Sequence, residues 1–199
     1  MAETGLRFET LEGDALRAWL PRLAGLRIAV FRDWPYLYEG EAGYEEGYLA
    51  AYAASPGAAV VAAIDRDRAV GCATCQPMTE ATARVQAAFR ARGLDPARFC
   101  YFGESVLLPR YRGQGAGVRF FAEREVHARR LGLPAAAFCA VVRDAQDPRR
   151  PPGHVPLDAF WAKRGFVARP DVSVVFDWKE VGGDRETPHA LTFWVKDPL

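Results

Sequence analysis

The sequence has no surplus of charge of either sign. Its 26 basic and 25 acidic residues give a formal net charge of +1 over 199 residues. A nearly neutral chain creates no broad electrostatic field that would recruit nucleic acid or an anionic membrane. We therefore expect no nucleic-acid partner and no membrane partner, and we expect any ligand to bind at a local site.

Long apolar runs are also missing. No window approaches the roughly 18 uninterrupted apolar residues that a membrane-spanning helix needs. The amino-terminal stretch MAETGLRFETLEGDALRAWL has no basic start followed by an apolar run, as a secretory signal would have. A cytoplasmic protein is the expectation that follows.

Residues that bind metals are sparse. The chain has four cysteines and three histidines, which are Cys72, Cys75, Cys100, Cys139, His127, His154 and His189. Cys72 and Cys75 form a C-x-x-C, which can belong to a zinc site or a redox pair. Their surroundings, AVGCATCQPM, are typical of a strand, and residues three apart on a strand point to opposite faces. We expect four buried, reduced thiols and no metal site.

The chain carries enough apolar residues for one domain over residues 1–199. Alternating and helical spacings predict the elements. The predicted strands are 6–11, 58–64, 69–78, 99–108, 135–142, 173–178 and 191–195, and the predicted helices are 14–31, 45–54, 79–92, 117–131 and 157–164. Asp14 is placed as the N-cap of the first helix. This order indicates an α/β (α+β) fold with a mixed sheet.

One segment, LLPRYRGQGAGV from Leu107 to Val118, carries the strongest functional indication. Its three glycines stand where a strand turns into a helix. Successive N–H groups in such a turn, together with the positive end of the helix, suit a pyrophosphate. A Walker A loop is excluded, because Val118-Arg119 stands where Lys-Ser/Thr is required. A dinucleotide fingerprint is excluded too, because its third glycine would fall on Phe120.

The segment fits the pattern R/Q-x-x-G-x-G/A, and the chain resembles the GNAT superfamily of N-acetyltransferases. The preceding apolar strand, the following helix and a later strand–helix ending in Lys-Arg-Gly-Phe extend the resemblance over nearly the whole chain. The resemblance implies a single GNAT-like domain with about seven mostly antiparallel strands, helices on both sides and a splayed central strand pair. It also implies acetyl-CoA as cosubstrate. The implied cofactor-binding residues are Ser105, Val106 and Leu107 for the pantetheine arm, and Arg112, Gly113, Gln114, Gly115, Ala116, Gly117 and Val118 for the pyrophosphate.

The same resemblance suggests which residues act as the general base and the general acid. Family members often place an acidic base on the strand before the loop, and Glu104 stands there. The usual acid, a tyrosine before Gly-Phe, is replaced by Trp161, and indole cannot act as an acid near neutrality. His154 is the substitute candidate, because histidine titrates in the right range. The alternatives are a solvent-facing Glu104 and an ordinary loop histidine.

The acceptor is expected to bind beside the connection between the first two helices. This connection, residues 31–39, is aromatic and carries two carboxylates, which together suit a cationic amine. The candidate substrate-binding residues are Arg32, Asp33, Trp34, Tyr36 and Tyr38. The implied activity is acetyl transfer to a primary amine of a small molecule or peptide, by direct attack in a ternary complex. Trp161 keeps open a non-catalytic acyl-CoA-binding or sensing module, and a homodimer is left open.

Overall fold

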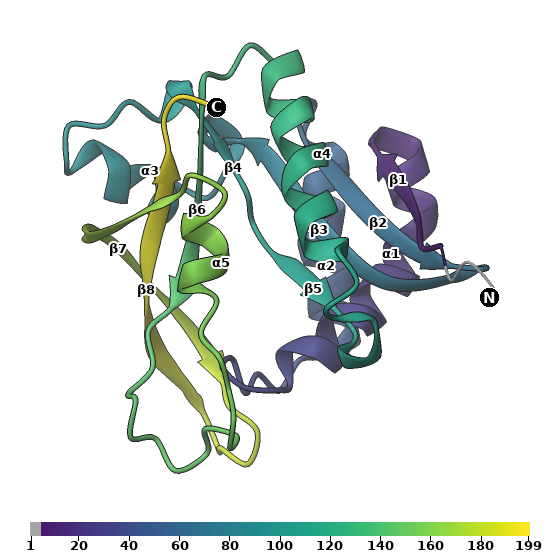
Figure 1. Ribbon diagram of the computed structural model, residues 1–199, viewed down its shortest axis with the longest axis vertical. Helices are drawn as coiled ribbons and strands as arrows, with labels where there is room; N and C mark the ends of the chain where they lie inside the picture. The colour runs from purple at the N-terminus through teal and green to yellow at the C-terminus, as the bar shows by residue number, and fades with distance from the viewer. Residues whose placement is uncertain (1–4) are drawn as a thin grey trace.

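The computed structural model describes residues 5–199 (Figure 1). The strands are β1 (Arg7–Leu11), β2 (Ala59–Asp65), β3 (Arg68–Pro77), β4 (Phe99–Tyr101), β5 (Ser105–Leu107), β6 (Ala135–Val141), β7 (Val167–Lys179) and β8 (Glu186–Lys196). The helices are α1 (Gly13–Phe31), α2 (Ala42–Ala54), α3 (Ala83–Arg90), α4 (Ala116–Arg130) and α5 (Asp158–Ala162), with short 3-10 turns η1 (Met78–Glu80), η2 (Pro96–Arg98) and η3 (Pro109–Tyr111). Together they form one domain, as expected.

The strands form one mixed sheet in the order β1-β2-β3-β4-β6-β8-β7, and β5 pairs with β3 off this path. β4 and β6 run parallel, whereas the other pairs are antiparallel. The mixed, mostly antiparallel sheet is therefore confirmed. It has eight strands rather than about seven, because the strand expected over 99–108 is split into β4 and β5.

Side chains alternate along the central strands and divide the core into two layers. On β2, Val60 and Ala62 pack toward α1 and α2, while Val61 and Ala63 pack toward Phe120 of α4. Strands buried on both faces read as continuous apolar runs, which is why β2 has the sequence AVVAAID. Figure 1 shows α4 and α5 in front of the sheet and α1 and α2 behind it. The two layers place any site at the centre of the sheet between two sets of helices.

The central strands separate beyond Gly103. β4 pairs with β6 as far as Tyr101↔Ala137, whereas β5 follows β3 through Cys72↔Val106. A Cβ on Gly103 would lie 2.2 Å from the Tyr52 hydroxyl oxygen and 2.5 Å from Thr74 Oγ1, so glycine is required there for space. β6 continues along β8, and within residues 5–199 no strand pairs with the edge of β5 that faces away from β3. The expected splayed strand pair is thus β5 and β6.

Some sequence expectations need correction. Asp14 is not the N-cap of α1: Glu12 takes that position in extended conformation, and Asp14 lies in the first turn, paired with Arg17. The helix expected over 79–92 begins later, because η1 and an extended Ala81 precede α3. β7 and β8 are longer than predicted and form a hairpin that extends beyond the rest of the sheet (Figure 1).

The four cysteines are free and buried, as expected. Cys72 belongs to the core on the α1 side, and Cys75 to the core on the α4 side. The strand geometry of β3 therefore separates the two thiols of the C-x-x-C. Within residues 5–199, no helix is long and apolar enough to cross a membrane.

Candidate functional site at the splayed strands

The glycine loop lies between β5 and the first turn of α4. Gly113 and Gly115 have φ of 76° and 84°, a left-handed conformation that side-chain-bearing residues rarely adopt. No atom lies within 4 Å of a Cβ built on either glycine, so conformation rather than space selects them. Gly115 is the N-cap of α4, whose first-turn N–H groups have no partner within the helix. The sequence pattern that predicted an anion-binding turn here has the backbone geometry that such a turn needs.

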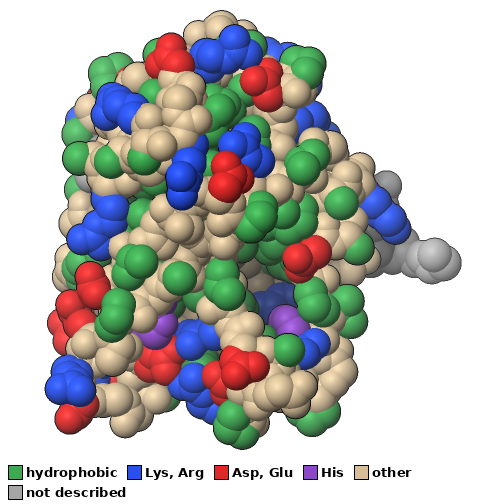
Figure 2. Space-filling view, turned by 90° about the vertical axis from the view of Figure 1, so that its left-hand side faces the viewer, with side chains coloured by type: hydrophobic (Ala, Val, Ile, Leu, Met, Phe, Trp, Pro, Cys, Tyr) green, Lys and Arg blue, Asp and Glu red, His purple; other side chains and the backbone are tan. Residues whose placement is uncertain are grey.

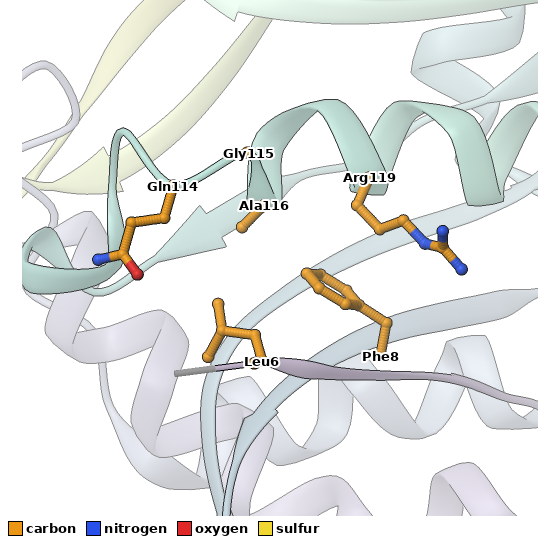
Figure 3. A pocket seen from close by; sticks show the side chains of 7 residues that line it. Leu6, Phe8, Gln114, Gly115, Ala116 and Arg119 are labelled. Atoms are coloured by element: carbon orange, nitrogen blue, oxygen red, sulfur yellow. The ribbon is translucent and has the colours of Figure 1, made fainter. Parts of the chain in front are cut away.

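An open pocket of about 770 Å³ lies against this loop. Gln114, Gly115 and Ala116 form one wall, and the other is formed by Leu6, just before β1, and Phe8 of β1 (Figure 3). Arg119 lines the pocket from the next turn of α4, whereas the amide of Gln114 points away from it and donates to the Arg110 carbonyl at 3.0 Å. Three of the predicted pyrophosphate residues therefore border a cavity, and Gln114 does so through its backbone.

The open edge of β5 offers unpaired backbone groups beside the loop. The Thr74 N–H donates to the Glu104 carbonyl at 3.0 Å, and the Leu108 N–H donates to the Val70 carbonyl at 2.9 Å. Because an antiparallel strand alternates its bonding direction, Val106 also faces β3, while Ser105 and Leu107 face the open edge. Arg112 Nε donates to the Leu107 carbonyl at 3.2 Å, so this arginine is tied to the strand end. Ser105 and Leu107 are the positions at which an extended ligand could pair.

α5 packs against the start of α4. The Phe160 ring lies 3.0 Å from the place where a Cβ of Gly117 would stand, so Gly117 permits this close packing. Trp161 lies edge-on to Phe138 and Trp194, with ring centroids 5.1 Å apart in both cases. Trp161 is thus a packing residue of the core on the α4 side, and its indole cannot serve as the acid. Val118, the last predicted loop residue, is half-exposed on α4.

Glu104 lies in the break between β4 and β5, with its side chain on the α1–α2 side. Its Oε1 lies 2.5 Å from Arg27 Nη1, in an ion pair without the alignment of a hydrogen bond. The Tyr48 hydroxyl donates to its Oε2 at 2.9 Å. The side chains of Glu104 and Arg27 are each 7% exposed, so the predicted alternative of a solvent-facing glutamate is wrong.

Arg27 is shared with a second buried carboxylate. Its Nε donates to Glu45 Oε2, and the Glu45 side chain is fully buried. Burial opposes the charge of Arg27, but Glu104, Tyr48 and Glu45 outweigh it and raise the Arg27 pKa well above its ordinary value. The guanidinium is therefore a permanent cation between two carboxylates.

The sequence marks both of these residues, although neither was among the predicted site residues. Arg27 follows Leu16, Leu20 and Leu23 at helical spacing, and so stands on the buried stripe of α1. Glu45 stands likewise one turn before Leu49 on α2. A charge on an apolar stripe indicates a buried partner.

The predicted acceptor residues separate into two groups. Trp34, Tyr36 and Tyr38 are partly buried, whereas Arg32 and Asp33 are exposed. Tyr36 packs between Phe31 and Trp178, at centroid distances of 4.6 and 5.9 Å. Burial, followed by Cys139 and Glu104, raises the Tyr36 pKa, so its phenol is neutral and lies within electrostatic reach of Glu104.

Contacts from distant segments hold this connection. Arg143 Nη2 donates to the Tyr36 carbonyl at 2.8 Å, and Trp178 Nε1 donates to the same oxygen at 3.1 Å. Arg143 also pairs with Glu180 at 2.5 Å. Burial opposes ionisation of Glu180, but the bonds from Arg149 and Arg143 outweigh it and lower its pKa. On the face of the molecule shown in Figure 2, basic, acidic and histidine side chains gather at the lower end.

His154 lies at the outer edge of this region. Its ring is edge-on to Trp34, with centroids 6.1 Å apart, and Arg150 donates to its carbonyl. A second histidine, which sequence reasoning did not select, lies nearby on β8: His189 stacks on Trp178 with centroids 3.8 Å apart. Burial, followed by Arg143, lowers the His189 pKa. The contacts of His154 thus belong to the acceptor connection.

Across residues 5–199, no group of three or more histidine, cysteine or acidic side chains is arranged to hold a metal ion. The described residues do match a thioester cosubstrate with a phosphate-bearing tail. The positive-φ loop at the α4 N-terminus suits the phosphates, and the open edge of β5 suits an extended amide chain.

Comparison with known proteins gives a consistent result. Residues 24–166 match the family model for the acetyltransferase (GNAT) family. No curated protein matches the sequence. Among solved structures, a ribosomal-protein-alanine N-acetyltransferase from Brucella melitensis is 16% identical, with a TM-score of 0.60 over 97% of this chain and 99% of that one. The PaiA N-acetyltransferase from Thermoplasma acidophilum, solved in complex with coenzyme A, is 11% identical, with a TM-score of 0.56 over 97% and 99%. The yncA protein of Salmonella typhimurium, solved with acetyl-CoA, is 14% identical, with a TM-score of 0.60 over 97% and 94%.

Proposed function

The chain belongs to the GNAT acetyltransferase family, and from this membership we propose that it transfers an acetyl group from acetyl-CoA to a primary amine. The acceptor is a small molecule or a peptide, and transfer occurs by direct attack in a ternary complex. One observation carries the proposal: the left-handed glycines at the start of α4 stand beside the open edge of β5, where the sheet splays. Acetyl-CoA supplies the activated acyl group when bound.

The chain's own residues divide the work. Gly113 to Ala116 hold the pyrophosphate through backbone N–H groups, and the edge of β5 at Ser105 and Leu107 aligns the pantetheine arm. Glu104 removes the proton from the acceptor ammonium, directly or through water, so that a neutral amine attacks. Support for this role is its position in the break between β4 and β5, where the sheet splays.

The departing thiolate needs no dedicated acid in this proposal. A thiol with an ordinary pKa, near 8.5, can leave as a thiolate and then take a proton from water. That route agrees with the packing of Trp161 between Phe138 and Trp194. His154, placed against Trp34, is assigned to the acceptor side rather than to protonation of the thiolate.

Trp34, Tyr36 and Tyr38 line the acceptor side. Their aromatic faces, with Glu104 within electrostatic reach of Tyr36, suit an amine that carries a positive charge. This assignment is supported by the partial burial of all three rings and by the fixed position of the Tyr36 backbone.

The replacement of the usual tyrosine by Trp161 favours a second candidate, a non-catalytic acyl-CoA-binding or sensing module. Two measurements separate the possibilities. Thermal shifts with CoA, acetyl-CoA and ATP test the cosubstrate, and stabilisation by ATP alone would contradict both candidates. Release of CoA is then followed with a panel of polyamines, amino acids and amino-terminal peptides. CoA binding without acceptor-dependent release would favour the binding module.

A further inference from the structure

Arg27 contacts Glu104 from the α1 side, and Glu45 contacts Arg27 in turn. We propose that they are positioning residues for the transfer reaction: Arg27 holds the Glu104 carboxylate at the splay, and Glu45 limits how much of the Arg27 charge that carboxylate receives. The inference rests on the proposed role of Glu104 as the base.

The geometry is that of one cation divided between two anions. Arg27 directs Nε to Glu45 and Nη1 to Glu104, and its guanidinium lies 4.2 Å from the centroid of the Tyr48 ring. Tyr48 in turn donates to Glu104 and lies 3.1 Å from the Tyr52 hydroxyl. Because α1 and α2 each supply one end of the ion pair, the packing of the two helices fixes the Glu104 side chain on two sides.

Groups from every packed element reach Glu104 electrostatically. They are Arg27 on α1, Glu45, Tyr48 and Tyr52 on α2, Cys72 on β3, Tyr101 on β4, Arg124 on α4, Cys139 on β6 and Tyr36 in the acceptor connection. Burial raises the pKa of each of these phenols and thiols, so they are neutral near pH 7. The charged groups in this set are therefore Arg27, Arg124 and Glu45.

Arg124 acts from the opposite layer. Its Nη1 donates to the backbone carbonyls of Thr74 and Glu104, each at 3.4 Å, and its guanidinium lies 4.3 Å from the Phe102 ring centroid. Burial lowers its pKa to about 10, so it remains a cation near neutrality. With Arg124 and Arg27 both positive, Glu45 is the only other anion in this set, and it opposes their combined effect.

Two guanidinium groups with no opposing negative charge would stabilise the carboxylate form of Glu104. Glu104 would then bind a proton weakly and act as a weak base. Glu45 counteracts this effect, because its negative charge offsets part of the positive charge of Arg27. Both side chains are buried, and charges interact more strongly when they are shielded from water. Replacing Glu45 by glutamine should therefore make Glu104 a weaker base without removing it. Replacing Tyr48 by phenylalanine should do the opposite, because it removes a hydrogen bond to the carboxylate form.

The test compares Glu45→Gln and Tyr48→Phe with wild type, and Glu46→Gln, the exposed neighbour on α2, is the matched control. The pH profile of kcat/KM for the acceptor is measured at saturating acetyl-CoA. We expect the acidic limb to move down by about half to one pH unit in Glu45→Gln and up by about half a unit in Tyr48→Phe. The plateau in Glu45→Gln should fall about two- to fivefold, and Glu46→Gln should match wild type.

A second readout needs no turnover. The glutamate side-chain carboxyl carbons are titrated by NMR in the CoA-free protein, and the Glu104 signal is identified by its loss in Glu104→Gln. The midpoint of the Glu104 titration should move down in Glu45→Gln and up in Tyr48→Phe, as the acidic limbs do. Equal midpoints in wild type and both variants, or movement in one common direction, would overturn the inference.

The two proposals fail separately. Wild-type protein that binds CoA but acetylates no amine contradicts the proposed function, and the NMR titration still decides the roles of Arg27 and Glu45. Active wild type with unmoved limbs and midpoints contradicts the positioning roles alone. If Glu45→Gln does not fold, Arg27→Lys carries the decision, because lysine keeps one positive charge but lacks the fork that reaches both carboxylates. An unmoved Glu104 midpoint in Arg27→Lys would overturn the inference.

Discussion

The surface around the glycine loop and the surface around Trp34 are made from the chain in different ways. The first, which we call the cofactor side, comes from residues 105–118, one continuous stretch that uses mainly backbone groups. The second, the acceptor side, combines residues 31–41 with Arg143, His154 and the β7–β8 hairpin. A ligand common to a family can be bound by backbone in a local motif. An individual acceptor needs side chains, which only the tertiary fold brings together.

The largest test of this division is Glu104→Gln, at the boundary between the two sides. The variant keeps the shape of the side chain but cannot accept a proton, so acceptor-dependent CoA release should fall about 100-fold or more. Stabilisation by CoA in a thermal-shift assay should stay close to that of wild type. Turnover within about threefold of wild type would rule out Glu104 as the base.

The next effect should come from Gly115→Val, which acts on the cofactor side alone. A β-branched residue at φ of 84° is strained by about 1–2 kcal/mol, so we expect the loop of the free variant to relax out of the binding conformation. Restoring that conformation on binding costs the same free energy, roughly a tenfold loss in affinity for acetyl-CoA. KM for acetyl-CoA should rise, and KM for the acceptor should change little. Gly43→Ala is the matched control, because Gly43 is exposed on α2 and no atom lies within 4 Å of a Cβ built there. Equal losses in both variants would mean a general loss of stability.

A smaller effect is expected from Trp34→Ala on the acceptor side. The ring lies 5.7 Å from the Arg143 guanidinium and edge-on to His154, so its loss opens one wall of the region. KM for the acceptor should rise about three- to tenfold, in line with the loss of one aromatic contact to a cation. KM for acetyl-CoA is the internal control. If the two constants rose together, the two sides would not be separable at Trp34.

The smallest change in rate should follow Trp161→Tyr. This variant restores the phenol that the family pattern has, yet the side chain packs among Phe138 and Trp194. We expect kcat to stay within about twofold and the free energy of unfolding to fall by roughly 1 kcal/mol, from lost aromatic packing. Chemical denaturation measures the second quantity. An increase in kcat of about tenfold would mean that the phenol reaches the thiolate after all.

The same division explains what the sequence could predict. The order of elements and the glycine loop were predicted from local periodicity and from the conformations that glycine permits, whereas the splayed strands were predicted from the resemblance to the GNAT superfamily. Arg143 and Trp178 could not be assigned, because each donates to the Tyr36 carbonyl from more than 100 positions away. His189 reaches this region by stacking on Trp178. Arg27 and Glu45 are an intermediate case. Their burial was readable from helical spacing, but their common partner, Glu104, was not.

The burial of all four cysteines has a practical consequence for chemical labelling. Cys72, Cys75 and Cys100 are fully buried and Cys139 is 8% exposed, and burial raises the Cys139 pKa to about 11. Such thiols react slowly with aromatic disulfides and maleimides, which attack thiolates. The folded protein should therefore give little background when released CoA is counted with a thiol reagent. A cysteine introduced by Val155→Cys, at a position 77% exposed, would be the preferred attachment point for a single fluorophore beside His154.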